Sequence, residues 1–117
     1  MAHITIWHNP RCSKSREALK LLEEKGESPE IVQYLNETPD AATIKKTLAM
    51  LGIGARDLLR SKETEYGELG LDDQSLSDDA IIDAMVAHPK LIERPVIIKD
   101  GKAVIGRPPE KVIELLA

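Results

Sequence analysis

A strand, a turn and a helix follow one another within the first 26 residues, and this order constrains the fold most. Ile4 and Ile6 alternate with Thr5 and Trp7, which is the period of a β-strand. The strand cannot continue through the Asn9-Pro10 turn, because proline has no N–H to donate to a β-ladder. Apolar residues then recur at helical spacing until a glycine that is suited to end the helix: Ala18, Leu19, Leu22 and Gly26. Cys12 therefore falls where the turn becomes a helix.

That position suits a cysteine that carries a negative charge. The first turn of a helix offers unpaired N–H groups and a partial positive charge, and both stabilise an anion. A cysteine in such a place has a pKa between about 3.5 and 7.5 rather than ~8.5. Positive charge is expected from neighbouring side chains: His8, Arg11, Lys14 and Arg16. The loop should hold a thiolate and bind a small oxyanion beside it. The alternative, a buried inert thiol, fits these polar neighbours less well.

The next segments predict a second strand and a helix. Glu30–Tyr34 reads as a strand, and the strand–helix–strand order predicts that the first two strands are parallel. Thr38 is expected to cap the following helix with Pro39 at its first position. Its apolar stripe would face the core and end at a glycine: Ile44, Leu48, Leu51 and Gly52.

The middle of the chain predicts further short helices. Residues 55–60 read as a short helix that points Leu58 and Leu59 inward and leaves Arg60 near its end. Taken alone, an arginine there is more often a solvated charge than a ligand. Residues 62–73 are rich in charge and contain two glycines, so short irregular or helical pieces are expected. Ser77 should cap another helix, with a buried face and a proline beyond its end: Ile81, Ile82, Met85 and Pro89.

The C-terminal part predicts a hairpin and a helix. An apolar strand at residues 96–98 is followed by Asp100-Gly101, a strong two-residue turn signal, and by a returning strand at residues 102–105. A last helix should turn three side chains toward the core: Val112, Ile113 and Leu116. The complete order is βαβ, then helices, then ββα.

Composition restricts the class of protein. A chain of 117 residues is expected to form one domain, and a formal charge of −4 argues against general nucleic-acid binding. One cysteine excludes an internal disulfide and a self-contained dithiol pair, so a cytoplasmic, reducing compartment fits best. We expect no signal peptide and no membrane span, because the chain enters a strand at once and lacks a long apolar run. The histidines stand at no spacing that suggests a metal site.

Several motifs together resemble one known family. The cysteine loop is similar to the active-site loop of the glutaredoxin-coupled arsenate reductases: His8-Asn9-Pro10-x-Cys12-x-x-Ser15-Arg16. Three later motifs resemble that family in order and spacing, and with the loop they span nearly the whole chain: Leu58-Leu59-Arg60, Glu93-Arg94-Pro95-Val96 and Ile105-Gly106-Arg107-Pro108.

The resemblance implies a fold. It predicts an α/β protein with a thioredoxin/glutaredoxin-like mixed four-stranded sheet. A helical insert at residues 39–90 would separate a βαβ unit at residues 1–38 from a ββα unit at residues 91–117, within one domain of residues 1–117. The family's fold also implies a cis peptide bond before Pro95, which would bring Arg94 beside Cys12.

The resemblance also implies a chemistry. Cys12 would be the nucleophile, and His8 would support its low pKa. Oxyanion binding would fall to three arginines and a serine: Arg60, Arg94, Arg107 and Ser15. Paired guanidinium groups suit the tetrahedral arsenate oxygens. Since this chain has no second cysteine, external thiols would complete the reduction to arsenite: glutathione as co-substrate and then glutaredoxin, with no bound cofactor or metal. Lys14 departs from the family's loop.

Two other classes remain open from the sequence. Spx-type regulators share this fold and bind RNA polymerase, but those that sense oxidation carry a Cys-x-x-Cys pair, and here the second position is Ser15. A monothiol glutathione-dependent oxidoreductase would need a glutathione groove but no arginine cluster. Arsenate protection of Cys12 from alkylation would distinguish an oxyanion pocket from both.

Overall fold

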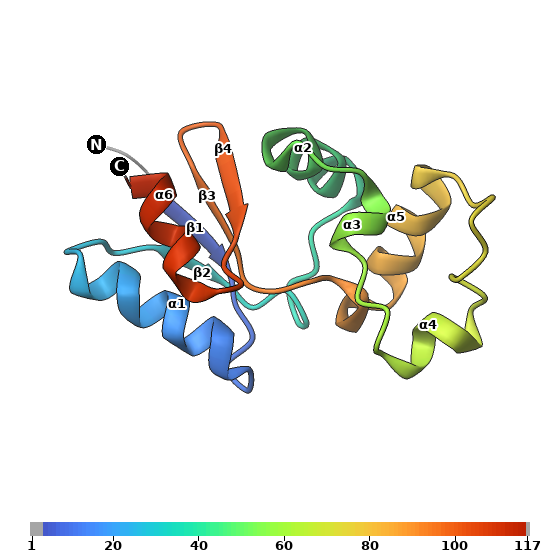
Figure 1. The fold of residues 1–117 in the computed structure, drawn as a ribbon, viewed down its shortest axis with the longest axis horizontal. Coiled ribbons are helices and arrows are strands. Elements are labelled where there is room, and N and C mark those ends of the chain that lie inside the picture. Colours follow the sequence, from blue (N-terminus) through green and yellow to red (C-terminus); the bar gives the residue numbers. More distant parts are fainter. Residues whose placement is uncertain (1–3, 117) are drawn as a thin grey trace. The chain divides into compact units, whose positions relative to one another are not determined.

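The computed structural model describes residues 4–116, which form two units. Of the described residues, 4–37 and 94–116 belong to unit 1, and unit 2 is the continuous segment Thr38–Glu93. Figure 1 shows the ribbon coloured along the sequence. No helix of the described residues is long and apolar enough to cross a membrane.

Unit 1 contains a four-stranded mixed sheet with the strand order β2-β1-β3-β4. Its strands are β1 (Ile4–Trp7), β2 (Glu30–Val32), β3 (Val96–Lys99) and β4 (Lys102–Ile105). As predicted, β1 and β2 are parallel; the β1–β3 and β3–β4 pairs are antiparallel. The second strand is shorter than expected, because the chain leaves the ladder after Val32.

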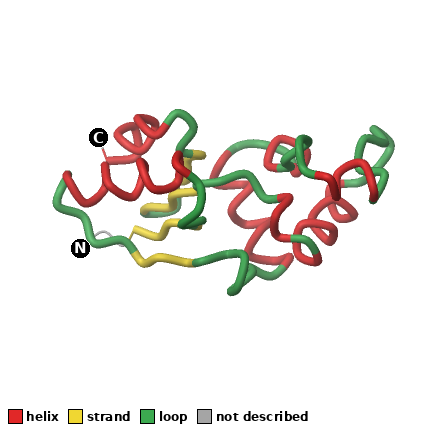
Figure 2. Tube along the Cα trace, turned by 90° about the horizontal axis from the view of Figure 1, so that it is seen from below, coloured by secondary structure: helices red, strands yellow, loops and turns green. Residues whose placement is uncertain are grey.

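Two helices cover one face of this sheet (Figure 2). Helix α1 (Ser13–Glu24) follows the cysteine loop, and a 3₁₀ turn, η2 (Pro109–Lys111), leads into α6 (Val112–Leu116). Their common core contains side chains from the sheet and from both helices: Ile4, Ile6, Ala18, Leu22, Ile97, Val112 and Leu115. This burial drives the packing of α1, and it fixes the position of the helix start that holds Cys12.

The β3–β4 hairpin has the predicted turn. Asp100 and Gly101 have φ angles of 51° and 78°. A type I′ turn needs positive φ at both central residues, and its twist matches that of the flanking strands.

The prediction for α6 was partly wrong: Val112 and Leu115 are buried, whereas Ile113 is 42% exposed. Leu116 is partly buried and packs against the core, so Val112, Leu115 and Leu116 make the inward face of this short helix.

Unit 2 is helical, with elements α2 (Ala41–Leu51), α3 (Ala55–Leu58), α4 (Thr64–Glu68), α5 (Asp78–Ala87) and η1 (Pro89–Leu91). Helix α5 contacts α2, α3 and η1. Ser77 caps α5 as predicted, because its Oγ accepts from the Ala80 N–H at 3.2 Å. The predicted buried face of α5 is also confirmed: Ile81, Ile82 and Met85. An antiparallel bridge joins Leu59 to Ile92.

The predicted start of α2 was wrong. Asp40, not Thr38, is the N-cap, and its Oδ1 accepts a hydrogen bond from the Thr43 N–H at 2.8 Å. Pro39 therefore precedes the cap. Both residue types are good caps, and in the structure it is the Asp40 side chain that accepts from the N–H of the first turn. The helix ends at Gly52 as expected, with φ of 70°.

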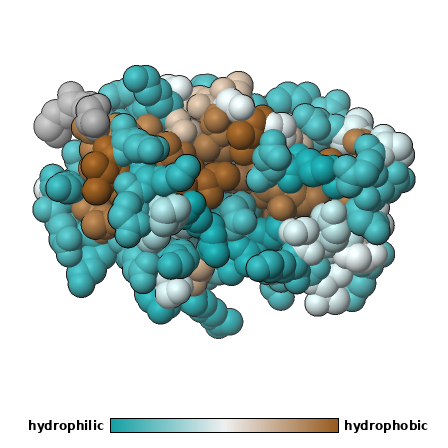
Figure 3. All heavy atoms as spheres, in the orientation of Figure 1, coloured by the Kyte–Doolittle hydropathy of each residue, from teal (hydrophilic) through white to brown (hydrophobic). Residues whose placement is uncertain are grey.

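The surface is largely hydrophilic on the face drawn in Figure 3, with smaller patches of hydrophobic side chains. Three large apolar side chains of the described residues are exposed: Ile31, Leu69 and Ile113. Isolated exposed apolar residues are ordinary on soluble proteins and need no partner to explain them.

Candidate active site around Cys12

Backbone hydrogen bonds shape the loop that presents Cys12. The His8 N–H donates to the Val32 carbonyl at 2.8 Å, which ties the end of β1 to β2. The Asn9 carbonyl then accepts from the Cys12 N–H at 3.0 Å, while Asn9 Oδ1 accepts from the Arg11 N–H at 3.0 Å. These bonds close a tight turn, and an asparagine side chain is well suited to stabilise it. The turn leads directly into α1.

Cys12 is the N-cap of α1, as the sequence predicted. Its backbone is extended, and its carbonyl accepts the first helical bond from the Arg16 N–H at 3.0 Å. The side chain is partly exposed. The sulfur thus lies at the end of the helix where N–H groups lack helical partners and where reagents in solvent have access.

Three groups lower the pKa of the thiol against one opposing effect. Burial is the largest influence and raises the pKa of Cys12. The backbone N–H of Ser15, the guanidinium of Arg94 and the backbone N–H of Lys14 lower that pKa, and together they outweigh burial. The pKa of Cys12 therefore lies below its ordinary value, and the thiolate is favoured.

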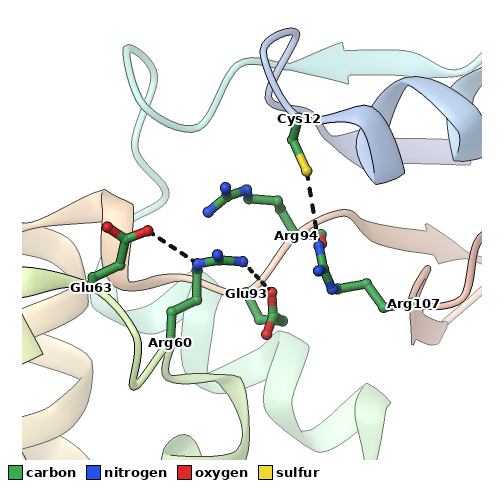
Figure 4. Close-up of polar contacts among 6 residues, drawn as sticks. All are labelled: Cys12, Arg60, Glu63, Glu93, Arg94 and Arg107. Carbon is green, nitrogen blue, oxygen red and sulfur yellow. Dashed lines mark hydrogen bonds and ion pairs between the residues drawn. The ribbon is translucent and has the colours of Figure 1, made fainter.

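Two of the predicted arginines lie at the sulfur. The peptide bond before Pro95 is cis, as expected, and the Arg94 guanidinium lowers the pKa of the Cys12 thiol. Arg107 Nη1 lies 3.9 Å from Cys12 Sγ and donates to the Arg94 carbonyl at 3.3 Å, so the two arginines also contact each other (Figure 4). A second cis bond, which we did not predict from the sequence, precedes Pro108.

His8 and Ser15 form a buried pair beneath the loop. His8 Nδ1 lies 2.7 Å from Ser15 Oγ, which also accepts from the Asn9 N–H at 3.0 Å. Burial, and secondarily the charge of Arg16, hold the pKa of His8 below 6.5. The lowered pKa favours the neutral imidazole, so His8 is a weaker source of positive charge than we expected. The Ser15 hydroxyl is engaged inside the loop, whereas the Ser15 backbone N–H acts on the thiol.

The remaining charged side chains of the loop have partners of their own. Lys14 Nζ lies 3.9 Å from Glu17 Oε2, and both side chains are exposed. Arg16 Nη1 donates to the Pro10 carbonyl at 2.9 Å, which closes the loop from outside. The departure at Lys14 therefore places its ammonium beside Glu17, while its backbone N–H serves Cys12.

Arg60 belongs to unit 2, where two carboxylates bind it. Nη1 lies 2.6 Å from Glu93 Oε1, and Nε lies 3.3 Å from Glu63 Oε1 (Figure 4). Neither glutamate was predicted from the sequence. The signal was present: Glu63 stands three residues after Arg60, and Glu93 stands directly before Arg94. Among the described residues, no group of three His, Cys, Asp or Glu side chains is arranged to hold a metal ion.

The site can stabilise a thiolate and bind an anion at the same place. Fold and site together define a thioredoxin-like protein with one cysteine at a helix start and arginines beside it. The ArsC family profile matches residues 7–115, and the chain belongs to that family.

Relatives and solved structures agree with this assignment. An uncharacterized Escherichia coli protein, YfgD, is 56% identical over 97% of this chain and 96% of its own. A Neisseria meningitidis protein named arsenate reductase is 48% identical over 99% of this chain and its own full length. The structure of an arsenate reductase from Vibrio cholerae is 49% identical, covers 96% of both chains and has a TM-score of 0.94. The predicted thioredoxin-like α/β fold and the family are thus confirmed.

Proposed function

We propose that this protein reduces arsenate to arsenite with Cys12 as the nucleophile and with glutathione and glutaredoxin as the source of electrons. The observation that carries the proposal is the Cys12 thiol at the N-cap of α1, whose pKa the Arg94 guanidinium lowers and whose sulfur lies 3.9 Å from Arg107 Nη1. Relatives named arsenate reductase, at 40–48% identity, support the choice of substrate.

In the first step the Cys12 thiolate attacks arsenic. An S–As bond forms, an As–O bond breaks, and the departing oxygen leaves as water after taking up protons. Arsenate is a tetrahedral oxyanion, and negative charge on its oxygens is best held by guanidinium groups. Arg94 and Arg107 lie at the sulfur and serve this role, together with the N–H groups of Lys14 and Ser15.

In the second step an external thiol supplies the remaining electrons. The glutathione thiolate attacks the Cys12 sulfur, an S–S bond forms, and the S–As bond breaks. Arsenic keeps that electron pair, so As(V) becomes As(III) and leaves as arsenite. The glutaredoxin thiolate then attacks the glutathione sulfur of the mixed disulfide and returns the Cys12 thiolate. The single cysteine of the chain supports this scheme, since the chain holds no resolving thiol of its own.

The other predicted site residues take supporting roles. Arg60 binds oxyanion oxygens, and Pro95 fixes the backbone that presents Arg94. His8 acts on the nucleophile through Ser15: the buried His8–Ser15 contact at 2.7 Å holds the backbone of Ser15, whose N–H lowers the pKa of Cys12. Ser15 thus acts on the anion through its N–H rather than through its hydroxyl.

The direct test is arsenate-dependent NADPH oxidation coupled through glutathione, glutaredoxin and glutathione reductase. The wild type should turn over, and Cys12→Ser should lose turnover while keeping the wild-type circular dichroism spectrum. Arsenate should also protect wild-type Cys12 from alkylation by iodoacetamide. A folded wild type that neither turns over nor is protected would contradict the proposal and favour a disulfide substrate or a binding role.

A further inference from the structure

The two carboxylates on Arg60 are the feature that the proposed chemistry leaves unexplained. An arginine assigned to an oxyanion already contacts two anions, with Nη1 at 2.6 Å from Glu93 and Nε at 3.3 Å from Glu63. The Arg60 side chain is 16% exposed, and each glutamate side chain is 27% exposed. Largely desolvated ion pairs with short contacts hold their geometry better than pairs on the surface.

The backbone builds this arrangement. Leu59 and Ile92 form an antiparallel bridge, the Arg60 N–H donates to the Leu91 carbonyl at 2.7 Å, and the Glu93 N–H donates to the Leu58 carbonyl at 2.8 Å. Arg60 and Glu93 therefore stand on two paired segments and cannot separate without breaking that pairing.

The Lys45–Asp79 pair of the same unit gives the contrast. It joins two side chains that are 65% and 74% exposed, at 3.0 Å. Such a pair is a surface contact of small energetic weight. The ion pairs of Arg60 with Glu63 and Glu93 are held more firmly, because paired backbone segments and largely buried side chains both fix them.

Some N–H donors of the Arg60 guanidinium bind the two glutamates, and others do not. Arginine has five N–H donors in a rigid plane. Within residues 4–116, Arg60 makes its contacts through its main chain and through one N–H each of Nε and Nη1, which leaves the second N–H of Nη1 and both N–H groups of Nη2 for a ligand. Holding a planar fork at two of its nitrogens fixes the direction of the third.

We propose that Glu93, assisted by Glu63, is a positioning residue that orients the Arg60 guanidinium so that Nη2 binds the oxyanion. This inference rests on the proposed function, which assigns Arg60 to arsenate. It differs from a hypothesis in which Glu93 merely competes with arsenate for Arg60. If Glu93 competes with arsenate, arsenate binding depends on the negative charge of Glu93 and not on the length of its side chain.

Two substitutions separate geometry from charge. Glu93→Gln keeps an acceptor at the same reach and removes the charge, whereas Glu93→Asp keeps the charge and withdraws the carboxylate by one methylene. Positioning predicts an arsenate KM within about threefold of wild type for E93Q and raised about tenfold or more for E93D, the scale of one lost charge-assisted contact. Competition predicts the reverse: KM lowered in E93Q and unchanged in E93D.

The experiment measures KM and kcat for arsenate and, independently of turnover, the arsenate concentration that half-protects Cys12 from iodoacetamide. Full-length wild type, E93Q, E93D, R60A and the R60A/E93D double variant are compared, with Asp79→Ala as the control for an exposed pair. E93D should weaken protection in the wild-type background and add nothing in R60A. Without arsenate, the pH profile of Cys12 alkylation should be the same in E93D as in the wild type. A general disturbance of the fold would shift that profile.

The outcomes separate the inference from the function on which it rests. If R60A weakens arsenate binding but E93D behaves as wild type, the positioning role of Glu93 is overturned and the function stands. If R60A binds arsenate as tightly as wild type, the assignment of Arg60 fails, and the inference fails with it. If E93D does not fold, Glu63→Asp tests the Nε contact by the same readouts, and wild-type protection in that variant would overturn the inference.

Discussion

Substitution of Gly106 by alanine should destabilise the protein through a local steric conflict. Gly106 follows β4, is buried, and donates its N–H to the Pro95 carbonyl at 2.8 Å. A Cβ at this position would lie 2.9 Å from Pro95 Cγ, 3.1 Å from Ile97 Cδ1 and 3.4 Å from Ala18 Cβ. The first two distances are shorter than van der Waals contact between carbon atoms, so a proline ring and a core side chain would have to move.

The size of the effect follows from the cost of overpacking a core. An inserted methyl group that forces such shifts costs about 1–3 kcal/mol. With an unfolding entropy of about 2.1 cal/mol/K per residue, a chain of 117 residues should lose about 4–12 °C in Tm. Gly67 offers a matched control, because it lies in α4 and a methyl group added there would have no atom within 4 Å. Gly67→Ala should be neutral or stabilise by up to about 1 kcal/mol.

The assay is thermal and urea unfolding of both variants, followed by circular dichroism. Ile97→Val removes Cδ1, the atom at 3.1 Å, and should relieve part of the conflict, so the double variant should lose less stability than the sum of the two single variants. If Gly106→Ala melts with the wild type, or if its effect and that of Ile97→Val simply add, the steric reasoning is wrong.

Two further predictions concern pH. Arg94→Ala should move the pH midpoint of Cys12 alkylation upward, because the guanidinium favours the thiolate; an unchanged midpoint in a rate-versus-pH series would contradict this assignment. The pKa of His8 is lowered in the folded protein, so below about pH 6.5 the unfolded chain binds more protons and wild-type stability should fall with pH. Urea unfolding between pH 5 and 8 should show a weaker pH dependence in His8→Asn, and parallel curves would refute a role for His8 in it.

The strands, the hairpin and the principal helices could be predicted because their signals are local. Alternation in β1, the Asp100-Gly101 turn and Ser77 before α5 each act within a few residues. Errors arose where two nearby residues offer the same local signal and the sequence pattern does not choose between them. Thr38 and Asp40 are both good caps, and Ile113 and Leu115 both flank the face of α6 that contains Val112 and Leu116.

The site was predictable to a different extent. The position of Cys12 follows from the strand–turn–helix pattern. The prediction that Arg94 and Arg107 lie near Cys12 came from the family resemblance and not from their spacing in the sequence. The engagement of the Ser15 hydroxyl with His8, and of Arg60 with Glu93, depends on which side chains meet in three dimensions. A sequence supplies the residue types for such contacts but not their pairing.

The strand order has a consequence for biosynthesis. β1 is central in the sheet, and its partner on one side, β3, begins only at Val96, after all of unit 2. The β1–α1–β2 segment and the whole of unit 2 are therefore synthesised before the strand that covers the open edge of β1. Domains fold as they emerge, and an uncovered edge is a template for pairing with other chains. The nascent protein thus carries its greatest risk of aggregation while Thr38–Glu93 is being made, and that risk falls only once the last fifth of the chain, from Val96 onward, has been made and has paired with β1.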